Sequence, residues 1–199
     1  MKQSSGGGES FMLPCGIDLP NTEGLKNAYE EQEGGFEALI SADRLADFLT
    51  DYTALIPEPI FFFLELPESG SAESEDYRLY YLDNCTRPVI KTLIKEYGSL
   101  LVGDGVCRFG FGGNESGDEI YVKLCKVMSI YCPNAERMSK ARKLFARYGM
   151  ERTERLLTPW ELATESTPMI CVRAEEDGIS LFDLPEMLKA AGMYEAESK

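Results

Sequence analysis

The strongest constraint on the fold lies in the segment 120–132, where hydrophobicity repeats every second residue. The even positions of this segment are apolar, with Lys126 as the one exception. A period of two residues is typical of a β-strand with one buried face. The segment is longer than an ordinary strand. We therefore expect either one long bent strand or two strands that meet near Cys125 and Lys126.

Other segments repeat with the periods of strands or helices and are bounded by turn and capping residues. Further strands are predicted at 60–66, 77–82, 106–111 and 168–173, and helices at 22–33, 42–56, 86–97, 134–148, from 159 and 183–192. Several strands follow one another without a helix between them, which favours antiparallel pairing. The sequence thus predicts an α+β fold, with a mostly antiparallel sheet of about five to six strands packed with about five to six helices.

The organisation along the chain is simple. Residues 1–12 are polar and glycine-rich and are predicted to be a disordered leader. We expect a single α+β domain over residues 13–199, because the polar loop at 67–76 joins two strands of one predicted sheet. Glycines mark two predicted helix ends: Gly34-Gly35 ends the first helix, and Gly98 caps the helix that starts near Pro88.

The charge is strongly and unevenly negative. The formal net charge is −14, and residues 1–85 carry 4 basic and 17 acidic side chains, whereas residues 86–160 carry 13 basic and 8 acidic ones. Such a chain repels nucleic acids and anionic lipids at long range, which makes nucleic-acid binding an unfavourable interpretation. Attraction to a basic protein partner is the easier interpretation, beside the simpler one that the charge keeps the protein soluble.

The chain contains no histidine, which excludes Ser-His and Cys-His catalytic pairs and imidazole-containing metal sites. Its six cysteines form no CxxC motif, so no zinc site is predicted. We expect free thiols in a cytoplasmic protein; the even number also permits disulfides, although nothing in the spacing indicates them. No segment has the length of a membrane-spanning helix. The sequence predicts no catalytic residue, no metal and no cofactor, and it leaves the oligomeric state open.

The glycine-rich segment 103–117 is the first candidate site. It lacks the third glycine of GxGxxG and precedes a predicted strand, so a hairpin loop is favoured over a nucleotide site. Four acidic residues in or beside it could bind a cation, but they lack the spacing of a calcium loop. We expect them to form the acidic surface that binds a basic partner, and they are Asp104, Glu115, Asp118 and Glu119.

Four other features have two interpretations each. Glu65 follows the apolar run IFFFL and lies either at the exposed end of its strand or in a buried, paired position. Cys107 is either a small buried side chain or a thiol nucleophile beside Arg108. The basic helix at 136–155 either complements acidic residues of this chain or a second subunit, or binds RNA. Trp160, the single tryptophan, either fills the core or anchors a partner at a rim.

Two stretches, KEYGSLLVGDGVCRFGFGGNESGDEIYV at 95–122 and YGMERTERLLTPW at 148–160, resemble segments of small bacterial cytoplasmic proteins. The size, acidity and α+β order are also similar to immunity proteins of bacterial toxin systems. This resemblance implies an acidic inhibitor that binds a basic toxin domain, and it assigns no functional residue.

Together these features predict a non-enzymatic, immunity-like protein-binding module with an acidic surface. The alternative is a histidine-free hydrolase that uses carboxylates, with or without a divalent cation. That alternative requires a concave pocket lined by at least two convergent carboxylates.

Overall fold

A computed structural model describes residues 11–197. Its largest unit is a nine-stranded sheet in the order β13-β5-β4-β6-β7-β8-β3-β2-β9. The strands are β2 (Ala28–Gln32), β3 (Gly35–Leu39), β4 (Ile60–Pro67), β5 (Tyr77–Cys85), β6 (Arg108–Gly113), β7 (Glu119–Val122), β8 (Met128–Tyr131), β9 (Glu151–Thr153) and β13 (Tyr194–Glu195). Among these strands only β2 and β9 pair in parallel.

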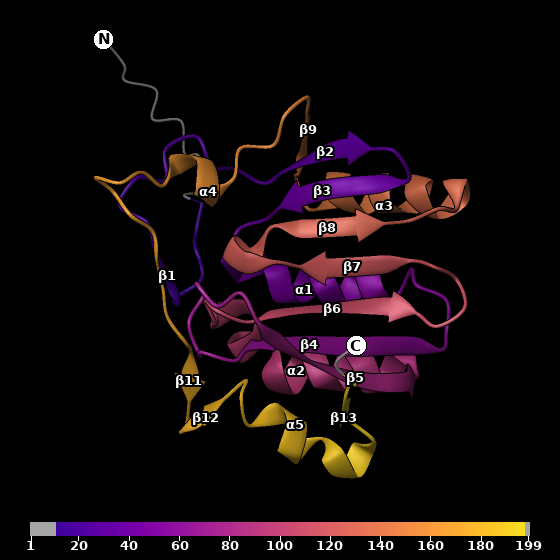
Figure 1. Ribbon diagram of the computed structural model, residues 1–199. Helices are drawn as coiled ribbons and strands as arrows, with labels where there is room; N and C mark the ends of the chain where they lie inside the picture. Colours follow the sequence, from indigo (N-terminus) through magenta and orange to yellow (C-terminus); the bar gives the residue numbers. More distant parts are fainter. Residues whose placement is uncertain (1–10, 198–199) are drawn as a thin grey trace.

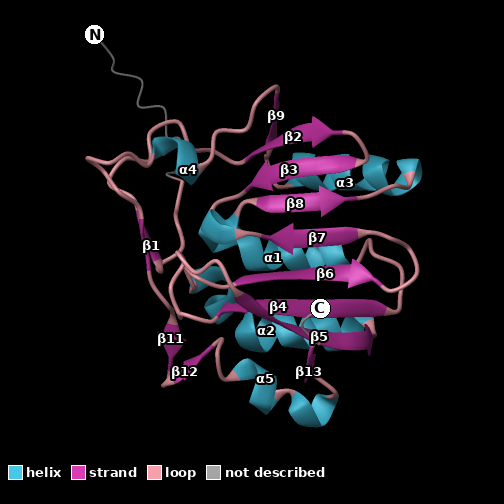
Figure 2. Ribbon diagram, in the orientation of Figure 1, coloured by secondary structure: helices cyan, strands magenta, loops and turns pink. Residues whose placement is uncertain are grey.

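The three long helices lie on one side of this sheet and are behind it in Figure 1. They are α1 (Ala42–Thr53), α2 (Arg87–Gly103) and α3 (Ala135–Arg147). The shorter helices are α4 (Pro159–Leu162), α5 (Leu184–Met187) and the 3₁₀ turns η1 (Leu124–Lys126) and η2 (Lys189–Ala191). Two small sheets, β1 (Ile17–Asp18) with β10 (Ile170–Cys171) and β11 (Glu175–Glu176) with β12 (Ile179–Ser180), lie beyond one end of the strands (Figure 2).

The core forms between the sheet and the three long helices. Alternate residues of β4, including Phe62 and Leu64, point to the helices and are fully buried. Phe109 and Phe111 of β6 lie beside them through the register of the two strands. Phe145 of α3 completes this layer of aromatic side chains. Burial of this apolar face is the main force that holds the helices on the sheet.

The predicted α+β class agrees with the structure, but the predicted strand count is wrong. The main sheet has nine strands, and two smaller sheets accompany it. The predicted helix at 22–33 is a loop followed by β2, which pairs with β3 through a turn at Gly34 (φ +76°). The glutamates of this segment suit a helix, yet Tyr29 and Phe36 each pack on Phe145 in the core, and that tertiary contact outweighs local propensity.

Other predicted boundaries also shift. Helix α2 does not stop at Gly98 but continues to Gly103. Gly98 is buried, and the methyl carbon of Ala46 in α1 would lie 3.5 Å from a Cβ at this position. The expected meeting of two strands near Cys125 and Lys126 is confirmed, because β7 and β8 are separated by η1.

None of the helices within residues 11–197 combines the length and the hydropathy that a bilayer-spanning helix requires. The first ten residues of the predicted leader lie outside the described part of the chain. The last two, Phe11 and Met12, are described, and the Met12 amide donates a hydrogen bond to Ser41 Oγ at 2.9 Å.

Candidate functional site

The side of the main sheet opposite the three long helices carries a continuous set of aromatic and charged side chains. We call this set the open face. It comprises Phe61, Phe63 and Glu65 of β4, Tyr81 of β5, Arg108 of β6, Glu119 and Tyr121 of β7, and the adjoining Lys123 and Glu37. Strand alternation places them there, because their sequence neighbours are the residues that fill the core.

Aromatic rings form the centre of the open face. The ring centroids of Phe63 and Tyr121 are 5.4 Å apart, and those of Phe61 and Tyr81 are 5.9 Å apart. The rings of β4 lie over Gly110 and Gly112 of β6, where any side chain would overlap them. The glycines of the segment 103–117 thus act within a strand, where they give room to aromatic rings, and not only in a hairpin loop.

Glu65 is paired, so it does not lie at a bare strand end. Its Oε2 accepts a hydrogen bond from the Tyr121 hydroxyl at 2.7 Å, and the Arg108 guanidinium lies 3.7 Å from the same atom. The guanidinium of Arg108 also stacks 3.9 Å from the ring centre of Tyr77. Burial and the carboxylate of Glu65 raise the pKa of Tyr121, so this hydroxyl remains protonated and acts as a donor.

Glu119 differs from the other carboxylates of the open face. Among residues 11–197 it forms no ion pair, and burial together with the negative charge of Glu65 raises its pKa. It pairs with Gly112 of β6, over which the ring of Phe61 lies, and its charge adds to burial in raising the pKa of Tyr81. The open face therefore holds an unneutralised carboxylate beside aromatic rings, an arrangement that favours a cation.

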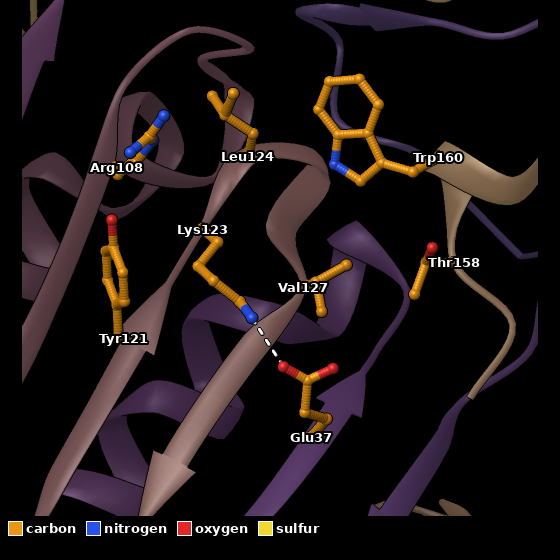
Figure 3. Close-up of a pocket in the computed structure, with 8 residues that line it drawn as sticks. All are labelled: Glu37, Arg108, Tyr121, Lys123, Leu124, Val127, Thr158 and Trp160. Atoms are coloured by element: carbon orange, nitrogen blue, oxygen red, sulfur yellow. Dashed lines mark hydrogen bonds and ion pairs between the residues drawn. The ribbon is translucent and has the colours of Figure 1, made fainter. Parts of the chain in front are cut away.

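The open face is hollowed at one end by a concave site of about 450 Å³. In Figure 3 the side chains of Lys123 and Glu37 point toward each other across its floor, with their ion pair at 2.6 Å. The indole of Trp160, 51% exposed, lies at the rim. The interpretation of Trp160 as a core residue is therefore wrong, and its position fits the rim alternative.

The four acidic residues predicted to form one partner-binding surface are not brought together. Asp104 lies before β6, whereas Glu115, Asp118 and Glu119 lie beyond its other end. Asp104 is completely buried and accepts hydrogen bonds from the backbone amides of Val106, Cys107 and Ala174 at 2.7–3.0 Å. These bonds make Asp104 a structural residue that joins the loop before β6 to the chain after β10.

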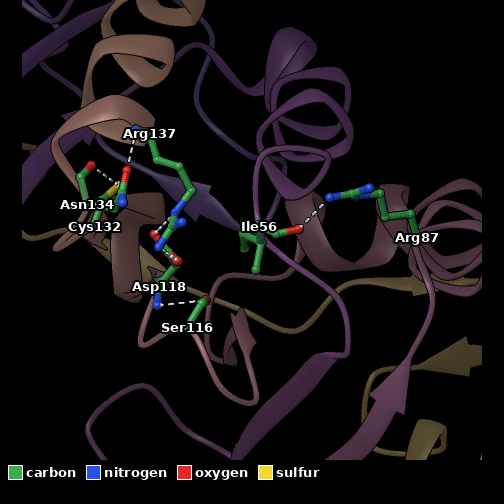
Figure 4. A network of polar contacts seen from close by, with 7 residues as sticks. All are labelled: Ile56, Arg87, Ser116, Asp118, Cys132, Asn134 and Arg137. Atoms are coloured by element: carbon green, nitrogen blue, oxygen red, sulfur yellow. Dashed lines mark hydrogen bonds and ion pairs between the residues drawn. The ribbon is translucent and has the colours of Figure 1, made fainter.

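Asp118 is also buried, at 2% exposure, and forms an ion pair with Arg137 of α3 at 2.7 Å (Figure 4). In the same network the Asp118 amide donates to Ser116 Oγ, and the Asn134 side chain caps α3 by accepting from the Arg137 amide at 3.0 Å. Glu115 is exposed in the loop, and only Glu119 belongs to the open face. A single acidic surface made of all four residues is therefore not present.

The structure also locates Cys107 and the basic helix. Cys107 is fully buried and its pKa is raised by burial, as expected of a small core side chain. The basic helix complements acidic residues of this chain, through Arg142 with Glu31 and Arg147 with Asp51. Within residues 11–197 no group of three Cys, Asp or Glu side chains is arranged to hold a metal ion.

The aromatic members of the open face were not predicted from the sequence. A signal was available, because the run IFFFLEL places Phe61, Phe63 and Glu65 on one side of a strand whose other side is purely apolar. Taken alone, a nearly continuous apolar run such as this one is also typical of a central strand covered on both sides. In the structure the three long helices all pack on one side of the sheet, so only one side of this strand is covered by helices. The sequence of the strand does not show on which side the helices pack.

A comparison with protein-family models, with curated proteins and with solved structures found no match for this chain. The resemblance to immunity proteins therefore stays a prediction, and the site must be interpreted from its own geometry.

Proposed function

We propose that this protein is a non-enzymatic binding module that receives an extended, basic segment of a partner protein on its open face. The observation that carries this proposal is the carboxylate of Glu119, which has no ion pair among residues 11–197 and pairs with Gly112, where the ring of Phe61 lies and packs on Tyr81. A lysine or arginine side chain placed there would neutralise the carboxylate and lie against aromatic rings.

The rest of the open face supports a protein segment as the occupant. Its hollow end supplies a rim tryptophan and an apolar wall of Leu124 and Val127, which suit an aliphatic side chain between the basic ones. The overall charge of −14 attracts a basic segment from a distance. A cytoplasmic inhibitor of a basic toxin domain, as the sequence resemblance implies, would use such a face.

The hydrolase alternative has less support in the geometry. The concave site is lined by one carboxylate, Glu37, and the ammonium of Lys123 lies 2.6 Å from it. Acid–base hydrolysis by carboxylates needs two such groups, one of them with a raised pKa. Glu119, whose pKa is raised, is not among the residues that line this hollow.

The test uses the fluorescence of Trp160, the single tryptophan, which lies at the rim. We would titrate the purified protein with a peptide of alternating arginine and leucine and with an acidic peptide of equal length. The basic peptide should bind saturably at low salt and change the emission, and the acidic peptide should not. If neither peptide, or both equally, changed the emission, the proposal would be wrong.

A matched pair of variants separates a local site from general charge attraction. Glu119→Gln and Glu115→Gln remove the same charge, one on the open face and one in the exposed loop. We expect Glu119→Gln to lower the affinity for the basic peptide by about fivefold to tenfold, a typical cost for the loss of one partly buried charge contact. Glu115→Gln should change the affinity less than twofold. Equal losses in the two variants would contradict a site at Glu119.

A further inference from the structure

The side chain of Lys126 lies inside the protein, in the turn η1 that joins β7 to β8. It is 2% exposed, and its Nζ is buried without a hydrogen-bond partner among residues 11–197. The ring centre of Phe109 in β6 lies 5.5 Å from this atom. Burial of an ammonium group that donates no hydrogen bond is very unfavourable, so the enclosed amine is uncharged.

The backbone of η1 has an uncommon conformation. Cys125 (φ +59°) and Lys126 (φ +57°) are both left-handed, which residues other than glycine seldom are. Two hydrogen bonds close the turn: the Lys123 amide donates to the Val127 carbonyl at 2.9 Å, and the Lys126 amide donates to the Lys123 carbonyl at 3.1 Å. The backbone that directs Lys126 inward is therefore strained, and it persists only while the surrounding structure holds it.

This turn also builds one wall of the concave site. Leu124 and Val127, two apolar residues that line the hollow, lie on either side of Cys125 and Lys126 in the chain, and the indole of Trp160 lies at the rim of the same hollow (Figure 3). Because the turn is short and closed by hydrogen bonds, Lys126 can leave the interior only if the backbone of η1 changes. Such a change moves Leu124 and Val127 as well.

We propose that η1 is a pH-dependent turn. The uncharged amine of Lys126 keeps it closed, and protonation of this amine moves the side chain into the solvent and opens the turn. The open turn withdraws Leu124 and Val127 from the wall of the concave site, so the complete hollow exists only while Lys126 is uncharged. The proposal does not depend on the proposed function of the open face.

The direction of the pH dependence follows from the difference in proton affinity between the closed and the open turn. Burial lowers the pKa of Lys126 in the closed turn, whereas a lysine in solvent has its ordinary pKa of about 10.4. The open turn therefore binds the proton more tightly, and acidification favours it. Between the two pKa values, one proton changes the ratio of open to closed turns by up to about tenfold for each pH unit.

Other titratable groups belong to the elements around this turn. Inside the protein, the groups whose charge acts on the amine are the carboxylate of Asp104, which favours the ammonium form, and the thiols of Cys107, Cys125 and Cys171. On the outer side, the charged residues that line the concave site are Arg108, Lys123 and Glu37. All of these groups remain in a variant that lacks only the amine, so such a variant isolates the titration of Lys126.

The experiment compares the full-length protein with Lys126→Met, which keeps the length of the side chain without its amine. From about pH 5 to about pH 9, below the ordinary pKa of lysine, we would record the emission of Trp160 and the hydrogen–deuterium exchange of residues 123–127, corrected for the intrinsic effect of pH on exchange. In the native protein the emission should change in a single-proton step, and protection of the segment should fall at least tenfold on the acidic side. Lys126→Met should lack the step and stay protected. The same step in both proteins, or no step in either, would overturn the proposal.

Two further variants complete the test. Lys91→Met removes an exposed lysine of α2 and should retain the step. Lys126→Arg introduces a side chain that stays charged over this pH range, and it should give the rapid exchange of the open turn at every pH. A folded Lys126→Arg protein that protects residues 123–127 would show that the interior holds a permanent positive charge, and would overturn the proposal. The comparison of the native protein with Lys126→Met is decisive even where Lys126→Arg does not fold.

Discussion

At the scale of single residues, the same type of side chain has different roles according to the partner that the fold supplies. Asp104 and Asp118 are both buried, one held by backbone amides and the other by Arg137. Glu115, three residues before Asp118, is exposed. The sequence shows four carboxylates near several glycines, but it cannot show which ones meet a donor, because the partners come from other elements.

The ion pair of Asp118 should make a large contribution to stability. Asp118→Asn leaves the Arg137 guanidinium partly buried without its carboxylate, and we expect a loss of about 2–4 kcal/mol in the free energy of unfolding. Urea denaturation monitored by circular dichroism measures this change. Glu115→Gln, in the same loop, should stay within about 0.5 kcal/mol of the native protein; a similar cost in both variants would contradict a structural role for Asp118.

Removal of the Glu119 charge should stabilise the protein, unlike removal of the Asp118 charge. Its pKa is raised in the folded state, so the folded protein binds protons more tightly than the unfolded chain, and stability falls as pH rises from about 4.3 through the folded pKa. Glu119→Gln removes this loss and should raise the melting temperature at pH 7 by about 1–2 °C. The gain should disappear below pH 4. A lower melting temperature at pH 7 would show that the carboxylate is stabilising.

At the scale of elements, glycines were the least predictable residues. The sequence suggested that Gly98 ends a helix, but α2 continues through it because its small size lets α1 pack closely. Gly110 belongs to the predicted strand 106–111 and lies within β6, but its place beneath the ring of Phe63 was not predicted. Helices and strands with a clear apolar period were recognised. Strands β9 and β13 have too few residues to show one, and β2, with the sequence AYEEQ, has no apolar alternation.

These two glycines give a matched prediction. Gly98→Ala places a methyl group at ordinary contact distance from Ala46 and Ile94 and should stabilise the protein by about 0.5–1 kcal/mol. Gly110→Ala places a methyl group 2.5 Å from the Ile120 carbonyl oxygen and into the ring of Phe63, and should cost about 1–3 kcal/mol. Thermal unfolding of the two variants measures the expected gain in stability for Gly98→Ala and the expected loss for Gly110→Ala. Destabilisation by Gly98→Ala would show that α1 and α2 pack more tightly than described.

At the scale of the whole molecule, the uneven charge of the sequence becomes a set of internal pairs. Basic residues of α3 and β9 meet acidic residues of the first half of the chain, as Arg142 and Arg152 meet Glu31. This complementarity was one of the alternatives drawn from the sequence. It uses the positive charges that RNA binding would need, and it leaves the net charge at −14.

Association with a basic segment should therefore be fast and sensitive to salt. We expect the association rate constant of the arginine–leucine peptide to fall about tenfold or more between 10 and 300 mM NaCl. At the higher salt concentration, dissolved ions screen the attraction between the charges beyond a few ångströms. Stopped-flow fluorescence of Trp160 measures it. A rate constant independent of salt would mean that the acidic field has no part in binding, and retention of the protein on RNA would contradict the assignment of the basic helix.

The position of the β2–β3 hairpin has a consequence for synthesis of the chain. Phe36 of this hairpin pairs with Ile130, and Ala28 pairs with Glu151. At about 5–20 residues per second, a ribosome needs on the order of 5–20 s to make the strand that will receive β3. During that interval both edges of the hairpin have unpaired backbone N–H and C=O groups. Such edges can pair with strands of other nascent chains and cause aggregation. Its carboxylates, Glu30, Glu31 and Glu37, repel the hairpins of neighbouring chains until their partners emerge.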